Sequence, residues 1–545
     1  MPWGVVLLGV FASWWSTLGA SLSDDGHNIA LAWRMSLGDA PFVDEMNLRA
    51  TGSFVAVPFT WLWTQLVGMT GLVLASRLFF VAVAFGTGFL VYRALRTSLP
   101  RATAVTATAV PLMALPYHLG QISYNTMPIM GLVLGTAAGF AAICTRDRRW
   151  AFGCGAATVT SVISFPTVVI GAAVLLTVVM LLSRQRTVII AVISGCLVVS
   201  LPFALWLLLA VGPSLIADTL RLTLDSQVVA APMSQRLGNV VAMYTTNLGQ
   251  WAYWPMWGAA LIASLPRLPS RIRAAAVATV PPLAIAPTLF TMLDGSPGMF
   301  GRLAGVYATV LCLALIVPVS IWTVQQARRD VGSLMILSLP VAVVQVPLVA
   351  AATMSGPHWG VHAIGICSLV MALTAGWQEM LAPAARPVAG TALVAASGLL
   401  LTMTPFRDPY PWEATTRITE GAFAGISTEA ARAERIADMS AAARRWVAPD
   451  EGVLMYGLAG DYLLTRGEPV TNLLWLGAFG GANQATLDYF DRTGRIPDVI
   501  FVNRLLIEDH GGYEAVAEED PLIEFILENY RLVDPEVDAA DVFRR

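Results

Sequence analysis

The chain has 545 residues, of which 56% are hydrophobic and 13% are charged, whereas a typical soluble domain carries about 25% charged residues. Its formal net charge is −3, and every basic residue other than histidine is arginine. This composition excludes an ordinary soluble enzyme, offers no basic surface for a nucleic acid, and predicts a polytopic membrane protein. The five cysteines lie in or beside apolar stretches, so we expect no disulfide or zinc framework.

Thirteen apolar runs follow one another along the first three quarters of the chain, each close to the roughly 20 residues that a helix needs to cross a bilayer. The first is interpreted as a retained helix and not a cleaved signal, because no basic segment precedes its apolar residues. The least distinct boundary lies at Phe165-Pro166, where one stretch divides into two short helices. The runs are 2–21, 71–92, 101–118, 126–144, 150–165, 166–183, 187–211, 249–265, 272–292, 301–323, 331–353, 359–381 and 387–404.

A further apolar segment, 53–70, is rich in aromatic residues but carries Pro58, and only Gly68 to Gly71 separates it from the next run. We interpret it as an interfacial helix of a first external loop, 22–70. Fourteen of the 20 arginines that precede the C-terminal tail fall in alternate connections, which the positive-inside rule places in the cytoplasm. The sequence therefore predicts a multi-pass protein of the cytoplasmic membrane, with its N-terminus inside and its C-terminal tail outside.

The chain changes character near Pro405. Residues 406–545 hold 25 of the 36 acidic residues and 13 of the 33 arginines. Helical patterns alternate there with short apolar runs, which is typical of a small α/β domain. We therefore expect a transmembrane domain, 1–405, and a soluble extracytoplasmic α/β domain, 406–545. The tail is expected to have helices at 427–446, 482–492 and 513–529, and strands at 453–457, 497–502 and 530–533.

Two adjacent carboxylates, Asp24 and Asp25, come just after the first apolar run. Ionisable groups at a membrane rim are costly to hold and are candidates for function, although acids in that position are often plain solvated loop residues. Eight acids and six arginines map to the predicted outer face, and together they suggest one polar cavity there. A carboxylate can accept a proton from a hydroxyl, and arginines can neutralise a phosphate leaving group. This chemistry suits transfer from a phosphorylated lipid.

The first loop resembles that of the GT-C glycosyltransferases, in particular the protein-O-mannosyltransferase and ArnT-like membrane enzymes. The resemblance rests on Asp24-Asp25, on the stretch Gly38-Asp39-Ala40-Pro41-Phe42-Val43-Asp44-Glu45, and on the aromatic helix that contains Pro58. About thirteen crossings followed by an external α/β domain also fit that layout. The resemblance implies a GT-C fold and an inverting transfer of a monosaccharide, hexosyl or pentosyl, from a polyprenyl phosphate to an acceptor hydroxyl at the outer face of the membrane.

The resemblance also implies roles for particular residues. Asp24 matches the acid that acts as catalytic base, and Asp25 matches the second catalytic acid, which is normally Glu. Asp44 would lie at the donor site, where Tyr124, Asn125 and His358 resemble polar positions of some relatives. The remaining residues expected to bind the donor phosphate or sugar are Arg49, Arg221, Arg236 and Arg302.

No cofactor is required by this reading, but some relatives use a divalent ion. Asp24, Asp25 and Asp44 would offer the oxygen ligands that Mg²⁺ or Mn²⁺ prefers. The expected partners are the polyprenyl-phosphate-linked donor, membrane lipid, and a glycan, lipid or protein acceptor. The alternatives are a transporter or flippase of lipid-linked glycans, a polysaccharide polymerase or ligase, and a glycan-binding scaffold. Charges at one rim and the lack of repeats favour the enzyme over a transporter.

Overall fold

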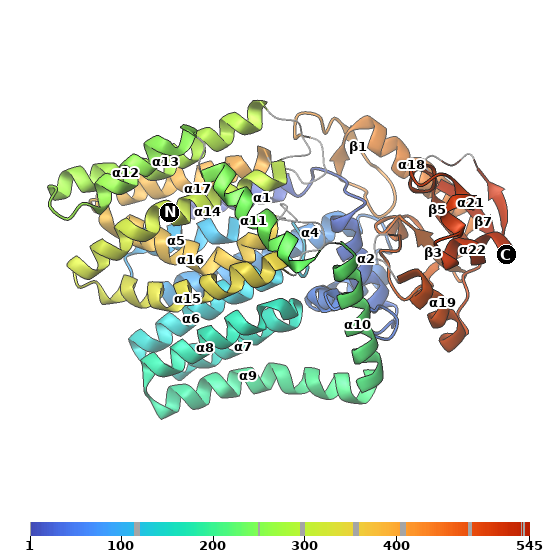
Figure 1. The fold of residues 1–545 in the computed structure, drawn as a ribbon, viewed down its shortest axis with the longest axis horizontal. Helices are drawn as coiled ribbons and strands as arrows, with labels where there is room; N and C mark the ends of the chain where they lie inside the picture. The colour runs from blue at the N-terminus through green and yellow to red at the C-terminus, as the bar shows by residue number, and fades with distance from the viewer. Residues whose placement is uncertain are drawn as a thin grey trace.

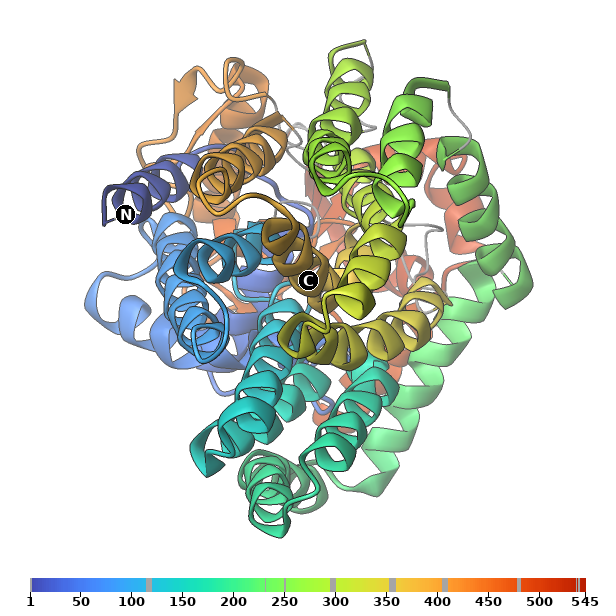
Figure 2. The ribbon, with the colours of Figure 1, turned by 90° about the vertical axis from the view of Figure 1, so that its left-hand side faces the viewer.

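The computed structural model describes residues 2–113, 120–230, 232–248, 251–294, 300–351, 359–403, 410–477, 482–535, 537 and 540–545. Figure 1 shows a bundle of long helices on the left and a smaller domain with a β-sheet on the right, at the C-terminal end of the chain. Figure 2 views the bundle from the end opposite this domain, which lies behind the helices. The expected class, a polytopic α-helical protein with a C-terminal α/β domain, is confirmed.

A helix is present in each of the thirteen expected crossings. They are α1 (Pro2–Trp15), α4 (Leu72–Leu95), α5 (Arg101–Met113), α6 (Met127–Thr145), α7 (Arg148–Ser164), α8 (Val169–Ser183), α9 (Arg186–Trp206), α12 (Trp254–Ser264), α13 (Ser270–Asp294), α14 (Phe300–Gln325), α15 (Arg329–Ala351), α16 (Trp359–Met380) and α17 (Arg386–Met403). Among the described residues, five stretches are both long and apolar enough to cross a membrane: Leu72–Leu95, Met127–Thr145, Pro166–Ser183, Arg186–Val211 and Arg329–Val349.

Several helices lie outside the expected crossings. The aromatic segment of the first loop forms η1 (Ala50–Ala56) and α3 (Val57–Leu66), with Pro58 in the first turn of α3, where a missing N–H is tolerated. Residues 212–248, which lie between two of the expected crossings, form α10 (Pro213–Ala230) and α11 (Met233–Leu248). The polar residues after the first run differ from expectation, since they begin α2 (Asp24–Ser36).

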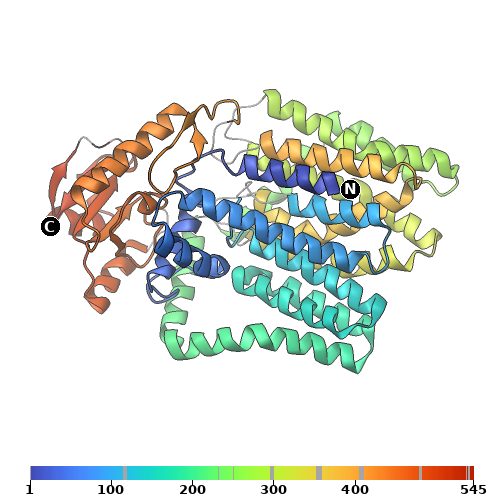
Figure 3. The same cartoon turned by 180° about the vertical axis from the view of Figure 1, so that it is seen from behind.

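The first helix ends at Trp15 and does not reach residue 21 as expected. The guanidinium of Arg77, in α4, donates hydrogen bonds to the carbonyls of Ser16, Leu18 and Gly19 at 3.1, 2.8 and 2.9 Å. The backbone of this segment also pairs with Ser427 of the short hairpin β1 (Thr416–Arg417) and β2 (Ser427–Thr428). These bonds satisfy the carbonyls of a non-helical segment and tie it to α4. Figure 3 shows α1 and α4 together on the face turned away in Figure 1.

The C-terminal domain is built on a five-stranded sheet of order β4-β3-β5-β7-β6. β3 (Gly452–Tyr456) runs parallel to β4 (Glu468–Pro469) and to β5 (Val499–Asn503), whereas β7 (Ala540–Arg544) is antiparallel to β5 and to β6 (Arg531–Asp534). β3 and β5 are almost wholly buried, as their unbroken apolar runs predict. The expected strands correspond to β3, β5 and β6, whereas β4 and β7 were not expected.

Helices cover this sheet: α18 (Ala430–Trp446), η7 (Asp461–Leu464), α19 (Ala482–Thr493), α20 (Arg504–Asp509), α21 (Tyr513–Ala517) and α22 (Pro521–Asn529). The single helix expected at 513–529 is therefore two helices. Pro521 opens the second one, because proline is tolerated in a first turn but not in a helix interior. The Asp520 side chain accepts hydrogen bonds from the N–H groups of Leu522 and Ile523 at 2.9 and 3.4 Å, which caps α22.

The first loop and the C-terminal domain share one hydrophobic core. Ile29 and Leu31 of α2 are buried in the same cluster as Ile436 of α18, Val453 of β3 and Phe501 of β5. Figure 1 shows α2 between the bundle and the sheet. The boundary expected near residue 405 lies outside the described residues, and the packing joins α2 of the first loop to the α/β part of the chain.

Several arginine-bearing connections meet at the end of the bundle away from the C-terminal domain. The buried Glu379 accepts hydrogen bonds from Thr103, Arg328 and Arg386 at 2.6, 3.2 and 2.9 Å, which joins three of these connections. α4 begins against the C-terminal domain, where the N–H of Val73 bonds the carbonyl of Ala422 at 3.0 Å. Its 24 residues then carry the chain about 36 Å toward the arginine-rich end.

Candidate functional site

The acidic pair occupies the first turn of α2. Asp24 and Asp25 are 9% and 3% exposed, so neither is a solvated loop acid. The N-terminus of a helix carries a partial positive charge, which favours carboxylates in this turn. The N-terminus of α2 therefore stabilises two adjacent buried carboxylates.

Asp25 is committed to Arg77. The Nε of Arg77 donates to Asp25 Oδ2 at 3.1 Å, and a second guanidinium nitrogen forms an ion pair with the same oxygen. Since Arg77 is itself only 5% exposed, this is a buried ion pair. Removing one partner of such a pair leaves an uncompensated buried charge. The ion pair of Asp25 with Arg77 therefore holds α2 against α4.

Asp24 lies beside amide side chains of α2 itself and of the loop before α6. Asn28 Nδ2 donates to the Asp24 carbonyl at 2.6 Å, and Gln121 Nε2 donates to the same oxygen at 3.2 Å. The other amide atoms, Asn28 Oδ1 and Gln121 Oε1, are buried and have no hydrogen-bond partner among the described residues, and the same holds for Asn125 Nδ2. Because buried polar groups are normally paired, this cluster of unpaired atoms is suited to a polar ligand.

Arg49 and Tyr124 form the next part of this wall. The Arg49 guanidinium carbon lies 5.5 Å from the centre of the Tyr124 ring and 5.6 Å from that of Phe165. Burial, followed by the negative charge of Asp24, raises the pKa of Tyr124 to about 12, so the phenol stays protonated. A Cβ on Gly52 would lie 2.3 Å from the Tyr124 nitrogen, so only glycine permits this approach of η1 to the loop before α6.

His27, one turn into α2, faces the C-terminal domain. Its ring centre lies 5.2 Å from that of Trp475, with the two planes at 59°. Burial lowers the pKa of His27 to about 3, so the imidazole is neutral at physiological pH. Its Nδ1 is buried and has no partner among the described residues.

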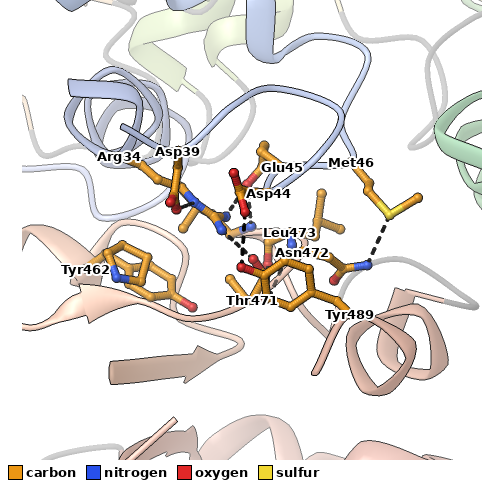
Figure 4. Close-up of polar contacts among 12 residues, drawn as sticks. Arg34, Asp39, Asp44, Glu45, Met46, Tyr462, Thr471, Asn472, Leu473 and Tyr489 are labelled. Carbon is orange, nitrogen blue, oxygen red and sulfur yellow. Dashed lines mark hydrogen bonds and ion pairs between the residues drawn. The ribbon is translucent and has the colours of Figure 1, made fainter. Parts of the chain in front are cut away.

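Asp44 belongs to a different set of contacts, shown in Figure 4. It caps the turn of the first loop through the N–H of Ala40 at 2.8 Å, and it meets Tyr489 and Arg495 of the C-terminal domain at 3.3 and 3.6 Å. The nearby Arg34 is 1% exposed and pairs with Asp39 at 2.7 Å and with Glu45 at 3.0 Å. The structure thus uses the conspicuous acids after Gly38 to hold the first loop on the C-terminal domain.

The other expected donor-binding residues are not gathered at Asp24. Arg221 is exposed on α10 and pairs with Asp218 at 3.6 Å. The side chains of Arg236 and Arg302 and the whole of His358 lie outside the described residues. Of the expected set, the structure brings together Asp24, Arg49, Tyr124 and Asn125.

The expected metal ligands do not form one site. In the described part of the chain, no group of three or more His, Cys, Asp or Glu side chains is arranged to hold a metal ion. Asp25 is bonded to Arg77, and Asp44 is bonded to the C-terminal domain. The three acids therefore do not fit a shared Mg²⁺ or Mn²⁺.

Gln121 and Asn28 were missed by the sequence analysis. The available signal was the polar run Gln121-Ile122-Ser123-Tyr124-Asn125-Thr126 between two apolar helices. Its contact with Asp24 joins residues 97 positions apart. A single sequence gives no measure of that proximity.

No protein-family model matches this chain, and no curated protein matches it. Two crystal structures of ArnT from Cupriavidus metallidurans are similar to it over 99% of this chain and 96% of theirs. The structure in the apo state is 13% identical with a TM-score of 0.43, and the one bound to undecaprenyl phosphate is 12% identical with a TM-score of 0.45.

Proposed function

We propose that this chain is an inverting glycosyltransferase that moves a monosaccharide from a polyprenyl-phosphate donor to an acceptor hydroxyl. The observation that carries the proposal is the place of Asp24 in the first turn of α2, beside buried amide atoms that have no partner in the described part of the chain. The neighbouring Asp25 is held by Arg77. The resemblance of the first loop supplies the donor class.

In the proposed reaction, Asp24 accepts the proton of the acceptor hydroxyl as that oxygen attacks the anomeric carbon of the donor sugar. The bond from the anomeric carbon to the phosphate oxygen breaks, and its electron pair leaves with the polyprenyl phosphate. Attack from the face opposite the leaving group inverts the anomeric configuration. Arg49, whose charge lies beside Tyr124, would neutralise the charge that develops on the phosphate.

The same proposal fixes an orientation in the cytoplasmic membrane. The cluster of Glu379 with Arg328 and Arg386 marks the basic end of the bundle, and basic loops favour the cytoplasm. The acidic pair and the C-terminal domain, at the other end, would then face outward, where lipid-linked sugars presented at the outer leaflet would reach Asp24.

The test uses the full chain in nanodiscs with a panel of radiolabelled polyprenyl-phosphate sugars. Asp24→Asn should lower donor consumption about 100-fold or more, since general-base catalysis contributes typically 10²–10⁴-fold. The matched control is Asp218→Asn, which removes an exposed acid of α10 and should leave turnover unchanged. Each reaction is run with and without EDTA, and a loss of turnover in EDTA would assign a role to a metal.

Two results would overturn the proposal. Full turnover by Asp24→Asn would show that Asp24 is not the catalytic base. Failure of the wild-type protein to consume any donor of the panel would favour a transporter, a ligase or a glycan-binding scaffold.

A further inference from the structure

The loop that leaves the carboxyl end of β3 lies against the first turn of α2. A Cβ on Gly460 would lie 2.1 Å from the carbonyl oxygen of Leu22, and one on Gly26 would lie 3.0 Å from Cα of Gly460. Gly460 has φ −86° and ψ −14°, a right-handed conformation that side chains tolerate. It is therefore the closeness of the two backbones, and not backbone strain, that leaves room only for a glycine.

This contact lies at the edge of the sheet where α/β domains usually hold a ligand. The chain passes from β3 to β4 on one side of β3 and then to β5 on the other side. Ligands of open α/β sheets bind outside the carboxyl ends of the strands at such a change of direction. Here the first turn of α2, which carries Asp24 and Asp25, lies against the loop that follows β3. The C-terminal domain thus holds a piece of its own chain at this edge.

Arg34 ties the last turn of α2 to the same domain. It is 1% exposed, and its guanidinium reaches two carboxylates of the first loop and one carbonyl of the C-terminal domain. It donates to Asp39 at 2.7 Å and to Glu45 at 3.0 Å, and it also donates to the carbonyl of Thr471. Glu45 in turn accepts from the N–H of Leu474 at 3.0 Å. Figure 4 shows Arg34 reaching these partners from both parts of the chain.

We infer that Gly460 and Arg34 are positioning residues, through which the C-terminal domain holds α2 at both ends and keeps Asp24 in place for the transfer. This inference rests on the proposed function, and it gives the domain a part in turnover. Asp24 and Arg34 belong to one continuous helix and lie about 15 Å apart along it, so a displacement of the last turn also moves the first. A misplacement of about 1 Å can lower a rate about 100-fold.

The donor side of the site is held separately, by the bundle. Arg49 lies against Tyr124 and Phe165, and the close approach of Gly52 to Tyr124 fixes η1 there. Loosening α2 from the C-terminal domain should therefore lower kcat and leave the KM for the donor unchanged.

The first measurement reports on the first turn of α2 and does not depend on turnover. Hydrogen–deuterium exchange of the full chain in nanodiscs is followed in a peptide that spans residues 24–30. The N–H groups of Gly26 and His27 bond to the carbonyls of Ser21 and Ser23 at 3.1 and 2.8 Å. These two amides exchange only when the turn opens, so their exchange rate measures how firmly it is held.

Two variants loosen the contact at opposite ends of α2. Arg34→Lys keeps the positive charge, but an ammonium group cannot replace a fork that reaches three partners. Gly460→Ala places a methyl group 2.1 Å from the Leu22 carbonyl oxygen and so displaces the first turn. Each variant should raise the exchange of the 24–30 peptide about tenfold or more. Each should also lower kcat, measured per amount of monodisperse protein, about tenfold or more.

The matched controls make the same changes inside the C-terminal domain. Arg504 donates to Asp541 and to the carbonyl of Ala540 at 2.9 and 3.3 Å. Gly452 lies at the other end of β3, where a Cβ would be 2.7 Å from a methyl carbon of Val470. Arg504→Lys and Gly452→Ala should therefore perturb the domain without displacing α2. Exchange of the 24–30 peptide and kcat should both stay at their wild-type values.

The results separate this inference from the proposed function. A wild-type protein that consumes no donor contradicts the glycosyltransferase, yet the exchange still shows whether the C-terminal domain holds α2. Wild-type exchange in both Arg34→Lys and Gly460→Ala overturns the inference, and so does a wild-type kcat in variants whose exchange has risen. An equal fall of kcat in the two control variants would show a general loss of stability and would overturn it as well.

Discussion

Asp461 of η7 is a carboxylate buried at the junction of α2 and the C-terminal domain. It is 1% exposed, and its nearest cation is Arg435, at 3.5 Å. Neither carboxylate oxygen has a hydrogen bond within the described residues. Burial raises the pKa of Asp461 from 3.8 to about 7, although Arg435 acts in the opposite direction.

This shift makes the wild-type protein less stable as the pH rises. Below pH 3.8, both folded and unfolded chains hold the proton; above it, the unfolded chain releases its proton first, so the folded state loses stability until the pH passes about 7. Each pH unit in this window lowers the free energy of unfolding by about 1.4 kcal/mol. Between pH 5 and pH 8, the contribution of Asp461 should therefore fall by about 2–3 kcal/mol.

Asp461→Asn removes the charge and keeps the shape, so it should abolish this part of the pH dependence. The measurement is urea unfolding of the full chain in detergent at pH 5 and pH 8, followed by tryptophan fluorescence. The free energy of unfolding of the variant, relative to wild type, should rise by about 2–3 kcal/mol between the two pH values. Asp450→Asn, which replaces an exposed acid of the same domain, is the control and should follow wild type. Parallel wild-type and Asp461→Asn curves would refute the reasoning.

Two further substitutions test the walls of the site. Arg77→Met leaves the buried Asp25 charge and three carbonyls without their partner, so the free energy of unfolding should fall by about 3–5 kcal/mol or more. The measurement is the melting temperature by differential scanning fluorimetry. A variant that melts at the wild-type temperature would show that the ion pair does not hold α2 in place. Gly52→Ala puts a methyl group 2.3 Å from the Tyr124 nitrogen and should lower donor turnover by at least tenfold. Gly153→Ala, whose new methyl group meets nothing within 4 Å, is the control and should leave donor turnover unchanged. Equal turnover by the two variants would contradict the close approach of Gly52 to the Tyr124 backbone.

The parts of the fold that were predicted correctly are those whose signals are local. Each apolar run of the bundle gives a helix because the bilayer sets its length and its backbone must bond internally. The buried strands β3 and β5 are likewise visible as short apolar runs. The end of α1 was predicted wrongly, and the non-helical segment that follows it is tied to the Arg77 guanidinium, about 60 positions further along the chain.

The same distinction applies to the site. Asp24 and Asp25 could be selected from sequence, since adjacent acids after an apolar helix are conspicuous. Their separate environments could not, because those depend on Arg77 and on Gln121, 52 and 97 positions away. Asp44 is equally conspicuous in sequence, but its partner Tyr489 is 445 residues distant. Sequence reasoning thus identifies charged groups, whereas the fold determines which of them are neutralised.

Two neighbouring acids at the start of a helix can have different roles. Successive residues of an α-helix point about 100° apart, so Asp24 and Asp25 can face different neighbours although their backbones are joined. The guanidinium of Arg77 is fully used by Asp25 and by the carbonyls of the segment before α2. The fixed acid anchors the first turn, and the first turn holds Asp24 beside Gln121. In the proposed reaction a base must be held within hydrogen-bonding reach of its proton, and the buried ion pair of Asp25 with Arg77 fixes the turn that carries Asp24.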